Sequence, residues 1–451
     1  MFNFYLACGK YIITIIFTAF TVLSAIALFR KFRDESTGIN IAMGILILLF
    51  HLSCFTSIFI QILSGNVPSY TLNSVIYLYI GQVLFLVGMI IVIPVFVELN
   101  YSLNLIMCMF IAVGFVIQTR LDFDTAVRQF YILLFSAVVF FVFVFFCKRA
   151  KFLRNMTWIY LALSVVLLIL VLILASYSSG AKISLDLGFI SFQPMEFVKI
   201  LFVMFVAAAF NKANNIRTVL VTAACALVHC IILVLCNDLG SALIIFVIYV
   251  LMVFVARKKI LYIIGGLAGL GVGGFAGYKL FPHVRVRFKT WLDPWSDIDN
   301  RGYQISQSLF AIGAGGFFGT GLFEGSPENI PLVSNDLVFS AISEELGGFF
   351  AIMMILLFLI FVLMMIKVSV NIEMVFYKLM AFGFSSTFAL QVFLNIGGAT
   401  KFIPLTGMNL PLISSGGSSL ISSMIIFGII QALYILAVHD GGAGKEVQHE
   451  E

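Results

Sequence analysis

The chain has 451 residues, of which 62% are hydrophobic and only 10% are charged. No soluble domain has an interior large enough for that apolar surface, so the composition excludes a soluble protein and indicates one whose solvent is a lipid bilayer. The net charge of +5 is small for this length and is concentrated in short loops, which gives no indication of a nucleic-acid partner.

Thirteen stretches are long and apolar enough to cross a membrane, at about 20 residues each. Because hydrocarbon offers the backbone no hydrogen-bond partner, spans are helices or closed barrels, and the lack of in/out alternation here favours helices. The sequence therefore predicts an all-α polytopic membrane protein. The first stretch lacks a basic leader and a small-residue cleavage site, so it is interpreted as a retained helix. The predicted spans lie near residues 11–29, 40–64, 75–97, 102–118, 130–147, 156–178, 197–211, 217–236, 239–256, 260–281, 341–366, 374–398 and 411–438.

Basic residues in the short loops predict the orientation of the chain. They follow the first, fifth, ninth and eleventh spans and flank the turn between the seventh and eighth. All of these loops fall on one side, which the positive-inside rule makes cytoplasmic. The N-terminus and the 282–340 segment are then outside, and the C-terminus is inside. The residues are Arg30, Lys31, Arg33, Lys148, Arg149, Lys151, Arg154, Lys212, Arg217, Arg257, Lys258, Lys259 and Lys367.

Residues 282–340 form a long extracellular segment without a membrane span. Trp291, Trp295 and Tyr303 are residue types that are rare in disordered segments, so we predict an ordered cap. Its basic residues lie on the side where the positive-inside rule does not expect them. An anionic lipid head group or a phosphate ligand would explain them, and so would simple solvation. They are Arg285, Arg287, Lys289 and Arg301.

The glycine run at 313–321 also has two interpretations. It could form a phosphate-binding nest, or it could let two backbone segments pack closely.

Ionisable side chains near a membrane are costly to keep there, so they are candidates for function. Glu196 and Lys199 are about one helical turn apart, at the outer end of the seventh span, and close enough to pair with each other. Asp238 precedes the ninth span, and a structural alternative is that it caps that helix.

A second group lies further along the chain. Asp336, Glu344 and Glu345 are found where the 282–340 segment enters the eleventh span, and Lys401 lies in the last outer loop. The GGSS stretch at 416–419 is more typical of small-residue helix packing than of ligand contact. His229, inside an apolar span, is interpreted as a hydrogen-bonded core residue without a functional role. The seven cysteines include no C-x-x-C pair, so neither a disulfide framework nor a zinc site is indicated.

Seven stretches resemble, in this order, the SEDS family, which comprises the FtsW, RodA and SpoVE proteins of cell division, elongation and sporulation. Together they thread the chain from about residue 102 to 438. They are TRLDFDTAVRQ (119–129), FISFQPMEF (189–197), DLGSAL (238–243), TWLDPW (290–295), GYQISQSLFAIGAGGFFGTGL (302–322), NDLVFSAISEELG (335–347) and NIGGATKFIPLTGMNLPLISSGGSSL (395–420).

The resemblance implies a ten-helix core at residues 102–438, which includes the extracellular loop 282–340. Residues 1–101 are then an N-terminal membrane extension of three helices. Residues 439–451 are polar and glycine-rich, and we predict a disordered cytoplasmic tail.

The resemblance also implies a function. SEDS proteins of this kind are peptidoglycan glycosyltransferases that polymerise lipid II on the outer face of the cytoplasmic membrane. The implied partners are lipid II as substrate and a class B penicillin-binding protein as transpeptidase. Two alternatives stay open. One is a lipid II flippase that uses the acids as a proton or ion relay. The other is a non-catalytic scaffold for a transpeptidase, in which Asp336 merely caps a helix.

Site roles follow from the same resemblance. The key loop aspartate of the family aligns with Asp336, which is the implied general base. Counter-charge for the leaving pyrophosphate would come from Arg285, Arg287 and Lys401, or from a divalent cation (Mg²⁺ or Mn²⁺). No organic cofactor is implied. The remaining predicted substrate-binding residues are Gln193, Glu196, Lys199, Asp238, Glu344 and Glu345.

The chain departs from the family pattern at a few positions, which affects the expected fine specificity more than the fold or the reaction. Cys236-Asn237 stands where Gln-Pro is usual, and Met195 where Ser is usual. Ser334-Asn335 replaces His-Thr before the loop aspartate, and Ser415 replaces the tyrosine before GGSS.

Overall fold

The computed structural model describes residues 2–32, 37–65, 71–149, 151–175, 177–178, 181–182, 184–186 and 191–446. Within these residues, thirteen helices are long and apolar enough to cross a membrane. The all-α fold and the number of spans predicted from the sequence are therefore confirmed. Arg33, which the orientation argument used, lies outside the described residues.

Most helices begin and end within a few residues of the predicted spans. The helices are α1 (Phe2–Leu28), α2 (Thr37–Leu63), α3 (Leu72–Val87), α4 (Ile93–Phe96), α5 (Tyr101–Leu121), α6 (Phe123–Arg149), α7 (Thr157–Leu174), α8 (Pro194–Lys212), α9 (Ile216–Leu235), α10 (Leu239–Arg257), α11 (Leu261–Leu280), α12 (Pro282–Leu292), α13 (Tyr303–Gly315), α14 (Val338–Val370), α15 (Val375–Ala399) and α16 (Gly417–Glu446). Short 3₁₀ turns occupy Lys151–Asn155, Pro294–Asp297 and Pro327–Asn329.

The described part of the loop between α7 and α8 contains short strands that were not predicted. β1 (Tyr177–Ser178) pairs with β2 (Ala181–Lys182), and β3 (Leu185–Asp186) pairs with β4 (Ser191–Phe192). Both pairs are antiparallel, and each strand has two residues.

The chain divides into two compact units, each built from separate stretches of sequence. Unit 1 comprises Met1–Phe135, Thr290–Met364 and Val392–Gly416. Unit 2 comprises Ser136–Lys289, Met365–Gln391 and Gly417–Glu451. The predicted organisation into an extension, a ten-helix core and a disordered tail stays a prediction. Of the predicted tail, residues 439–446 continue α16, and residues 447–451 lie outside the described residues.

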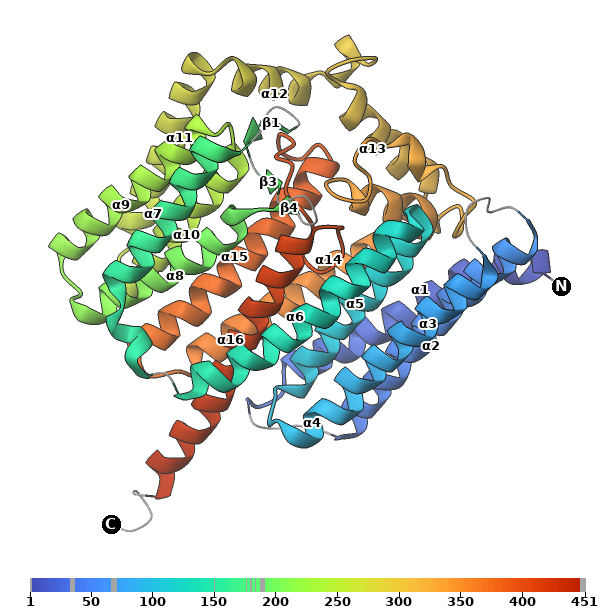
Figure 1. Cartoon of the computed structure of the whole chain (residues 1–451), viewed down its shortest axis with the longest axis horizontal. Helices are drawn as coiled ribbons and strands as arrows, with labels where there is room; N and C mark the ends of the chain where they lie inside the picture. The colour runs from blue at the N-terminus through green and yellow to red at the C-terminus, as the bar shows by residue number, and fades with distance from the viewer. Residues whose placement is uncertain are drawn as a thin grey trace. The chain divides into compact units, whose positions relative to one another are not determined.

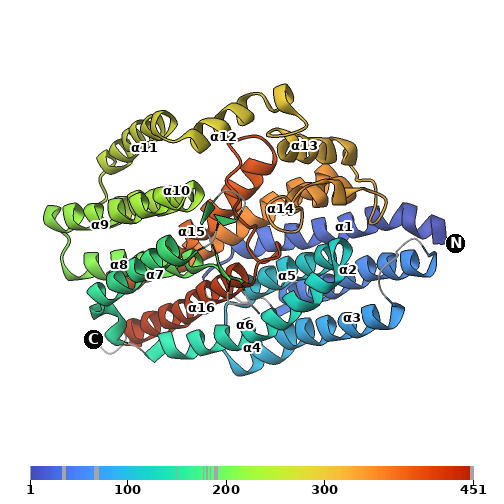
Figure 2. The same cartoon turned by 45° about the horizontal axis from the view of Figure 1, so that its top comes forward.

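In unit 1, α1, α2 and α3 pack beside one another and against α5 (Figures 1 and 2). α5 is apolar and buried at almost every position, so it forms the centre of this group. Aromatic rings join the N-terminal helices to α14. The rings of Phe17 and Phe350 have centroids 4.2 Å apart, and Phe50 lies 6.2 Å from the same ring.

The third span contains a π-helical turn, Gly88–Val92, between α3 and α4. A π turn disturbs the regular helical bonding of its carbonyls, and hydrocarbon supplies no replacement. α5 supplies the donors. Asn104 Nδ2 donates to Met89 O at 2.9 Å, and Tyr101 Oη donates to Ile90 O at 2.7 Å. The turn is therefore fixed to α5.

In unit 2, α7 to α10 pack together, α16 packs against α8, and α11 packs against α10. His229 Nε2 of α9 lies 2.9 Å from Ser164 Oγ of α7, and its Nδ1 lies 2.8 Å from Cys225 O. These contacts confirm the interpretation of His229 as a hydrogen-bonded core residue.

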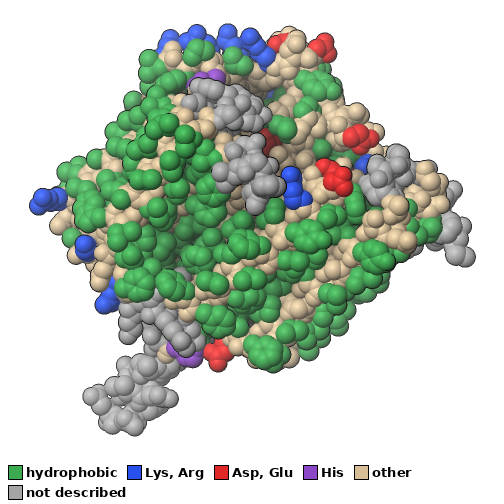
Figure 3. All heavy atoms as spheres, viewed as in Figure 1, with side chains coloured by type: hydrophobic (Ala, Val, Ile, Leu, Met, Phe, Trp, Pro, Cys, Tyr) green, Lys and Arg blue, Asp and Glu red, His purple; other side chains and the backbone are tan. Residues whose placement is uncertain are grey.

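The 282–340 segment is ordered, as predicted, and holds α12 and α13. Trp291 Nε1 donates to Lys401 O at 3.0 Å, and the rings of Trp295 and Phe310 are 5.6 Å apart. Figure 3 shows Lys and Arg side chains gathered over α12, while hydrophobic side chains cover the flanks of the helices.

α14 is broken at Gly347, whose φ of +91° is a conformation that favours glycine. The glycine run at 313–321 lies against this break, and three backbone N–H groups donate across the contact at 2.9 Å. The donors are Thr320 to Glu344 O, Gly321 to Glu345 O, and Gly348 to Gly316 O. The N–H groups of Thr320 and Gly321 are therefore already bonded, which supports close backbone packing as the role of this part of the run.

The predicted spans cross the membrane in alternating directions, which assigns each helix end to one side. Within each unit, hydrogen bonds and ion pairs join helix ends that are assigned to the same side. In unit 1, Lys10, Gln61 and Arg120 all bond residues between 319 and 345. In unit 2, Arg257 at the end of α10 bonds Asn214, which lies between α8 and α9. The alternation of the spans is consistent with the prediction, and the side that faces outward stays a prediction.

The close packing of the glycine run predicts a difference between two alanine substitutions in α13. A Cβ at Gly315 would lie 2.1 Å from Ser343 O, whereas a Cβ at Gly313 would meet nothing within 4 Å. We expect Gly315→Ala to lower the free energy of unfolding by about 1–3 kcal/mol, the usual cost of overpacking. Gly313→Ala should leave it unchanged or raise it slightly, because alanine favours a helix. Thermal unfolding in detergent measures both, and equal midpoints would contradict this account of the packing.

Candidate functional site

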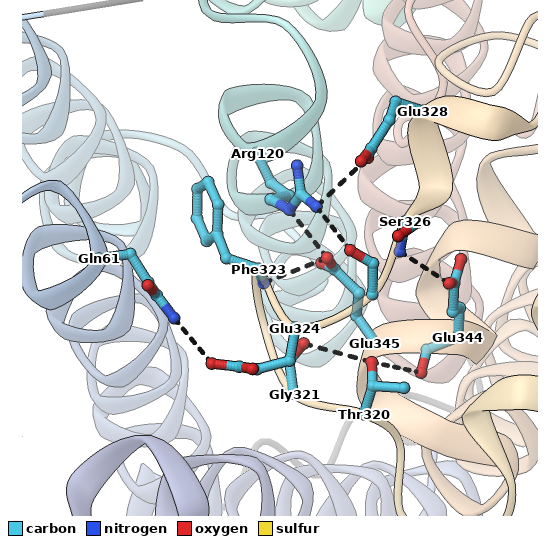
Figure 4. Close-up of polar contacts among 11 residues, drawn as sticks. Gln61, Arg120, Thr320, Gly321, Phe323, Glu324, Ser326, Glu328, Glu344 and Glu345 are labelled. Carbon is cyan, nitrogen blue, oxygen red and sulfur yellow. Dashed lines mark hydrogen bonds and ion pairs between the residues drawn. The ribbon is translucent and has the colours of Figure 1, made fainter. Parts of the chain in front are cut away.

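An arginine–carboxylate cluster joins α5, the 313–328 segment and α14 in unit 1 (Figure 4). Arg120 Nε lies 2.8 Å from Glu345 Oε1, and Arg120 Nη2 lies 3.5 Å from Glu328 Oε2. The guanidinium also covers the ring of Phe323, 4.4 Å from its centroid. Glu345 is buried and Glu328 is exposed, so removing Arg120 would cost the protein mainly through Glu345.

Glu344 and Glu345 tie this segment to α14. Glu345 Oε1 accepts from the backbone N–H of Phe323 at 3.1 Å, and Glu344 Oε1 accepts from that of Ser326 at 2.8 Å. Both carboxylates thus bond groups of their own chain. Their predicted part in substrate binding stays a prediction.

Asp336 lies two residues before α14 and is half-buried. Its backbone is held by an amide side chain from another helix. Asn395 Nδ2 of α15 donates to Asp336 O at 2.8 Å and also bonds Met408 O. Gln118 Nε2 of α5 donates to Ser334 O at 3.1 Å. The segment that carries Asp336 is therefore fixed by side chains far from it in sequence.

The loop before α16 holds the same segment. Ser415 N donates to Ser334 O at 2.8 Å, and the hydroxyls of Ser414 and Ser415 donate to the carbonyl and side-chain oxygens of Asn335. Ser334-Asn335 and Ser415 are two of the departures noted above. Because they bond each other directly, they form one altered contact beside Asp336.

The Asp336 carboxylate lies beside Gly407, a turn residue that has no side chain. Gly407 has a φ of +73°, and a Cβ there would lie 3.4 Å from Asp336 Oδ2. Lys401, at the other end of this loop, is half-buried and bonds Trp291 through its carbonyl oxygen. Both residues belong to unit 1.

In unit 2, the start of α8 carries a buried ion pair. Lys199 Nζ lies 2.8 Å from Glu196 Oε1, which confirms that the two residues pair. Glu196 Oε2 accepts from Ser422 Oγ at 2.7 Å, and the backbone N–H of Gln193 donates to Ser418 Oγ at 3.0 Å. The serines of α16 therefore bond α8 as well as pack against it.

Asp238 caps α10, because its Oδ1 accepts from the backbone N–H of Ser241 at 3.0 Å. The structural alternative considered for Asp238 is thus confirmed, and its part in substrate binding stays a prediction. Burial raises the pKa of the Asp238 carboxyl; its bonds to Ser241 and the positive charges of Lys199 and Arg287 oppose that rise. Gln193, Glu196, Lys199, Asp238 and Arg287 all belong to unit 2.

Arg285 bonds the end of the preceding helix. Its guanidinium donates to Lys279 O at 3.0 Å and to Tyr278 O at 3.4 Å, both in the last turn of α11. A cation at a helix C-terminus is favoured by the helix dipole. Arg285 and Arg287 belong to unit 2, whereas Asp336 belongs to unit 1.

Sequence reasoning missed several residues that position these groups. Arg120 stands in the quoted stretch 119–129, and its signal was a basic residue at the outer end of an apolar span. Gln118 and Asn395 are amides in apolar spans, where polar groups are costly unless bonded. Ser418 and Ser422 are four residues apart, so they share one face of a helix.

The family profile for FtsW, RodA and SpoVE, described as "Cell cycle protein", matches residues 89–436. α1, α2 and α3 precede the matched region. A relative named "Peptidoglycan glycosyltransferase RodA" from Mycobacterium tuberculosis is 37% identical over 273 residues, which are 56% of this chain and 58% of that protein. The chain thus spans less than two thirds of that relative.

"Stage V sporulation protein E" from Bacillus subtilis is 32% identical over 299 residues, which are 64% of this chain and 81% of that protein. A solved chain from "Structural coordination of polymerization and crosslinking by a peptidoglycan synthase complex" has a similar fold, with a TM-score of 0.64 and 26% identity. It covers 74% of this chain and 97% of its own. Because the family profile matches well over half of the sequence, the chain belongs to the FtsW/RodA/SpoVE family of cell cycle proteins.

Proposed function

We propose that the chain is a peptidoglycan glycosyltransferase that polymerises lipid II on the outer face of the membrane. Membership of the family and the name of the Mycobacterium tuberculosis relative support this activity. The structural observation that carries it is the placement of Asp336. Its backbone is held by α15 and its segment by α5 and the loop before α16, while its half-buried carboxylate lies beside Gly407.

The reaction joins two lipid-linked disaccharides. The 4-hydroxyl oxygen of one GlcNAc attacks the anomeric carbon of a MurNAc, and the bond from that carbon to the pyrophosphate oxygen breaks. Undecaprenyl pyrophosphate leaves with the bonding electrons, and Asp336 accepts the proton of the attacking hydroxyl. Glycosidases need a second carboxyl group to protonate a poor leaving group. A pyrophosphate leaves without that help, so one general base is enough.

A leaving pyrophosphate also needs positive charge nearby. Among the described residues, no carboxylate forms an ion pair with Lys401, so its charge is available to an anion. In unit 2, Lys199 is already paired with Glu196 at 2.8 Å. We therefore assign Lys401 to the pyrophosphate and give the buried Glu196–Lys199 pair a structural role.

A divalent cation is the other candidate for this counter-charge. In the part of the chain that the structure describes, no group of three or more His, Cys, Asp or Glu could hold a metal ion. These side chains alone do not build a metal centre, so no step of the reaction is assigned to a metal. Mg²⁺ often binds through one or two carboxylates together with substrate phosphates, which is how a cation would enter here.

We also propose that the chain works with a class B penicillin-binding protein. The support is the similar fold of a chain from a peptidoglycan synthase complex. The assays below are therefore done with and without the purified transpeptidase.

The first prediction concerns Asp336→Asn, which keeps the size of the side chain and its ability to cap a helix. We expect polymerisation of lipid II by the purified protein to fall about 10²- to 10⁴-fold, the usual cost of losing a general base. Asp299→Asn is the matched control, because Asp299 is an exposed acid in the same extracellular segment.

Near-normal polymerisation by Asp336→Asn at an unchanged melting temperature would contradict the assignment and favour a capping role. Transfer of lipid II across vesicles without polymer would indicate a flippase. If the wild-type complex shows neither polymerisation nor transfer of lipid II, the result would indicate a scaffold.

The second prediction concerns the buried ion pair. Lys199→Met leaves the Glu196 carboxylate buried without its cation, and breaking such a pair costs about 3–5 kcal/mol. The double variant Glu196→Gln/Lys199→Met removes both charges and should recover most of that loss. Thermal unfolding monitored by circular dichroism measures the difference. A double variant as unstable as the single one would show that the pair is not the source of the stability.

The third prediction tests the orientation. Ser326 and Glu373 are both exposed, in loops that the alternation of spans assigns to opposite sides. In intact cells, an impermeant maleimide should label Ser326→Cys but should label Glu373→Cys only after the membrane is opened. The unsubstituted chain sets the background from its own cysteines. The reverse pattern would overturn the extracellular location of the site.

A further inference from the structure

The N-terminal helices hold the 313–328 segment through three contacts in unit 1. Lys10 Nζ of α1 donates to Gly319 O at 2.8 Å, and the ring of Tyr11 lies 5.3 Å from that of Phe318. Gln61 Nε2 at the end of α2 donates to Glu324 Oε1 at 3.0 Å (Figure 4). α1 and α2 precede the region that matches the family profile, whereas the segment they hold lies inside it.

The same segment holds the first part of α14. The N–H groups of Thr320 and Gly321 donate to the carbonyls of Glu344 and Glu345, and Ser326 N–H donates to the Glu344 carboxylate. These bonds lie just before the break at Gly347, where α14 lacks its own continuous bonding. Because the helix is interrupted there, its first part depends on the segment for its position.

α14 begins at Val338, six residues before Glu344, and Asp336 lies two residues before that start. A short, rigid piece of helix thus connects the segment to the carboxylate. A displacement of about 1 Å at a reacting group can cost 10²-fold in rate. Small movements of the 313–328 segment would therefore displace Asp336 and lower the rate of the reaction.

We propose that Gln61 and Lys10 are positioning residues, and that the N-terminal helices set the place of Asp336 through the 313–328 segment. This inference rests on the proposed function. The contact of Gln61 gives the clearer test of the two, because Gln61 is only 1% exposed and donates to a carboxylate. Hydrogen bonds to ionised groups are stronger than neutral ones, and a buried amide without a partner is costly.

The test is the kinetics of Gln61→Leu in the full-length protein with its transpeptidase. We expect kcat for lipid II polymerisation to fall about 10-fold with KM unchanged, because Gln61 acts on Asp336 and not on the substrate. Thr56→Val is the matched control, since among the described residues the Thr56 hydroxyl bonds only Leu52 O of its own helix. An unchanged kcat for Gln61→Leu would overturn the proposal.

A charge swap distinguishes the bond from general packing. Gln61→Glu places a second carboxylate against Glu324 and should lower kcat at least as much as Gln61→Leu. Gln61→Glu/Glu324→Gln restores an amide-to-carboxylate bond in the reverse direction and should recover most of the activity. Failure of the double variant to recover, with a normal melting temperature, would overturn the role of this bond.

Amide hydrogen exchange gives a readout that does not depend on activity. In Gln61→Leu, the amides of Thr320 and Gly321 should exchange faster than in the wild type, and in Thr56→Val they should not. If the wild-type complex does not polymerise lipid II, the proposed function fails while this measurement still decides the contact. Unchanged exchange in Gln61→Leu would overturn the inference even if polymerisation is established.

Discussion

A peptide group inside a bilayer has no water to bond, so an irregular stretch of a span needs hydrogen-bond partners from another segment. α14 can break at Gly347 because the 316–321 stretch supplies backbone partners on both sides of the break. The third span can widen into a π turn because α5 supplies Asn104 and Tyr101 as donors. The non-helical stretch that carries Asp336 is bonded by Gln118 and Asn395. A functional group can therefore lie on an irregular stretch where another segment supplies the hydrogen bonds that a regular helix would have made.

Buried charges, like buried peptide groups, need partners. Burying an ion costs several kcal/mol unless a partner compensates it. Glu345 has Arg120 and Glu196 has Lys199, each at 2.8 Å. These acids hold neighbouring segments together, and the charge of each is compensated by a basic residue of the same chain. Asp336 differs from them in being only half-buried, and Asn395 and Gln118 bond the backbone of its segment. The division of labour among the acids follows from burial and partner, which residue type alone does not reveal.

Much of the fold was predictable because hydrophobic length and the helical requirement act locally. All thirteen spans, the pairing of Glu196 with Lys199 and the order of the 282–340 segment followed from such local patterns. The contacts of Arg120, Gln61 and Lys10 did not, because they join residues that lie hundreds of positions apart. The contact between Ser415 and Asn335 was also hidden, although both had been noted as departures. Sequence marks which residues are unusual, and only the fold shows which of them meet.

The bond between Lys10 and Gly319 joins residues 309 positions apart, and this has a consequence for biosynthesis. A ribosome adds roughly 5–20 residues per second, so about 15–60 seconds separate the synthesis of the two partners. During that interval α1 and α2 are already made, while the segment that they will hold does not yet exist. The helices synthesised first therefore complete these contacts only after most of the chain has been made. A nascent chain that stops before residue 319 exposes their binding surface, where the insertion machinery or another membrane protein can reach it.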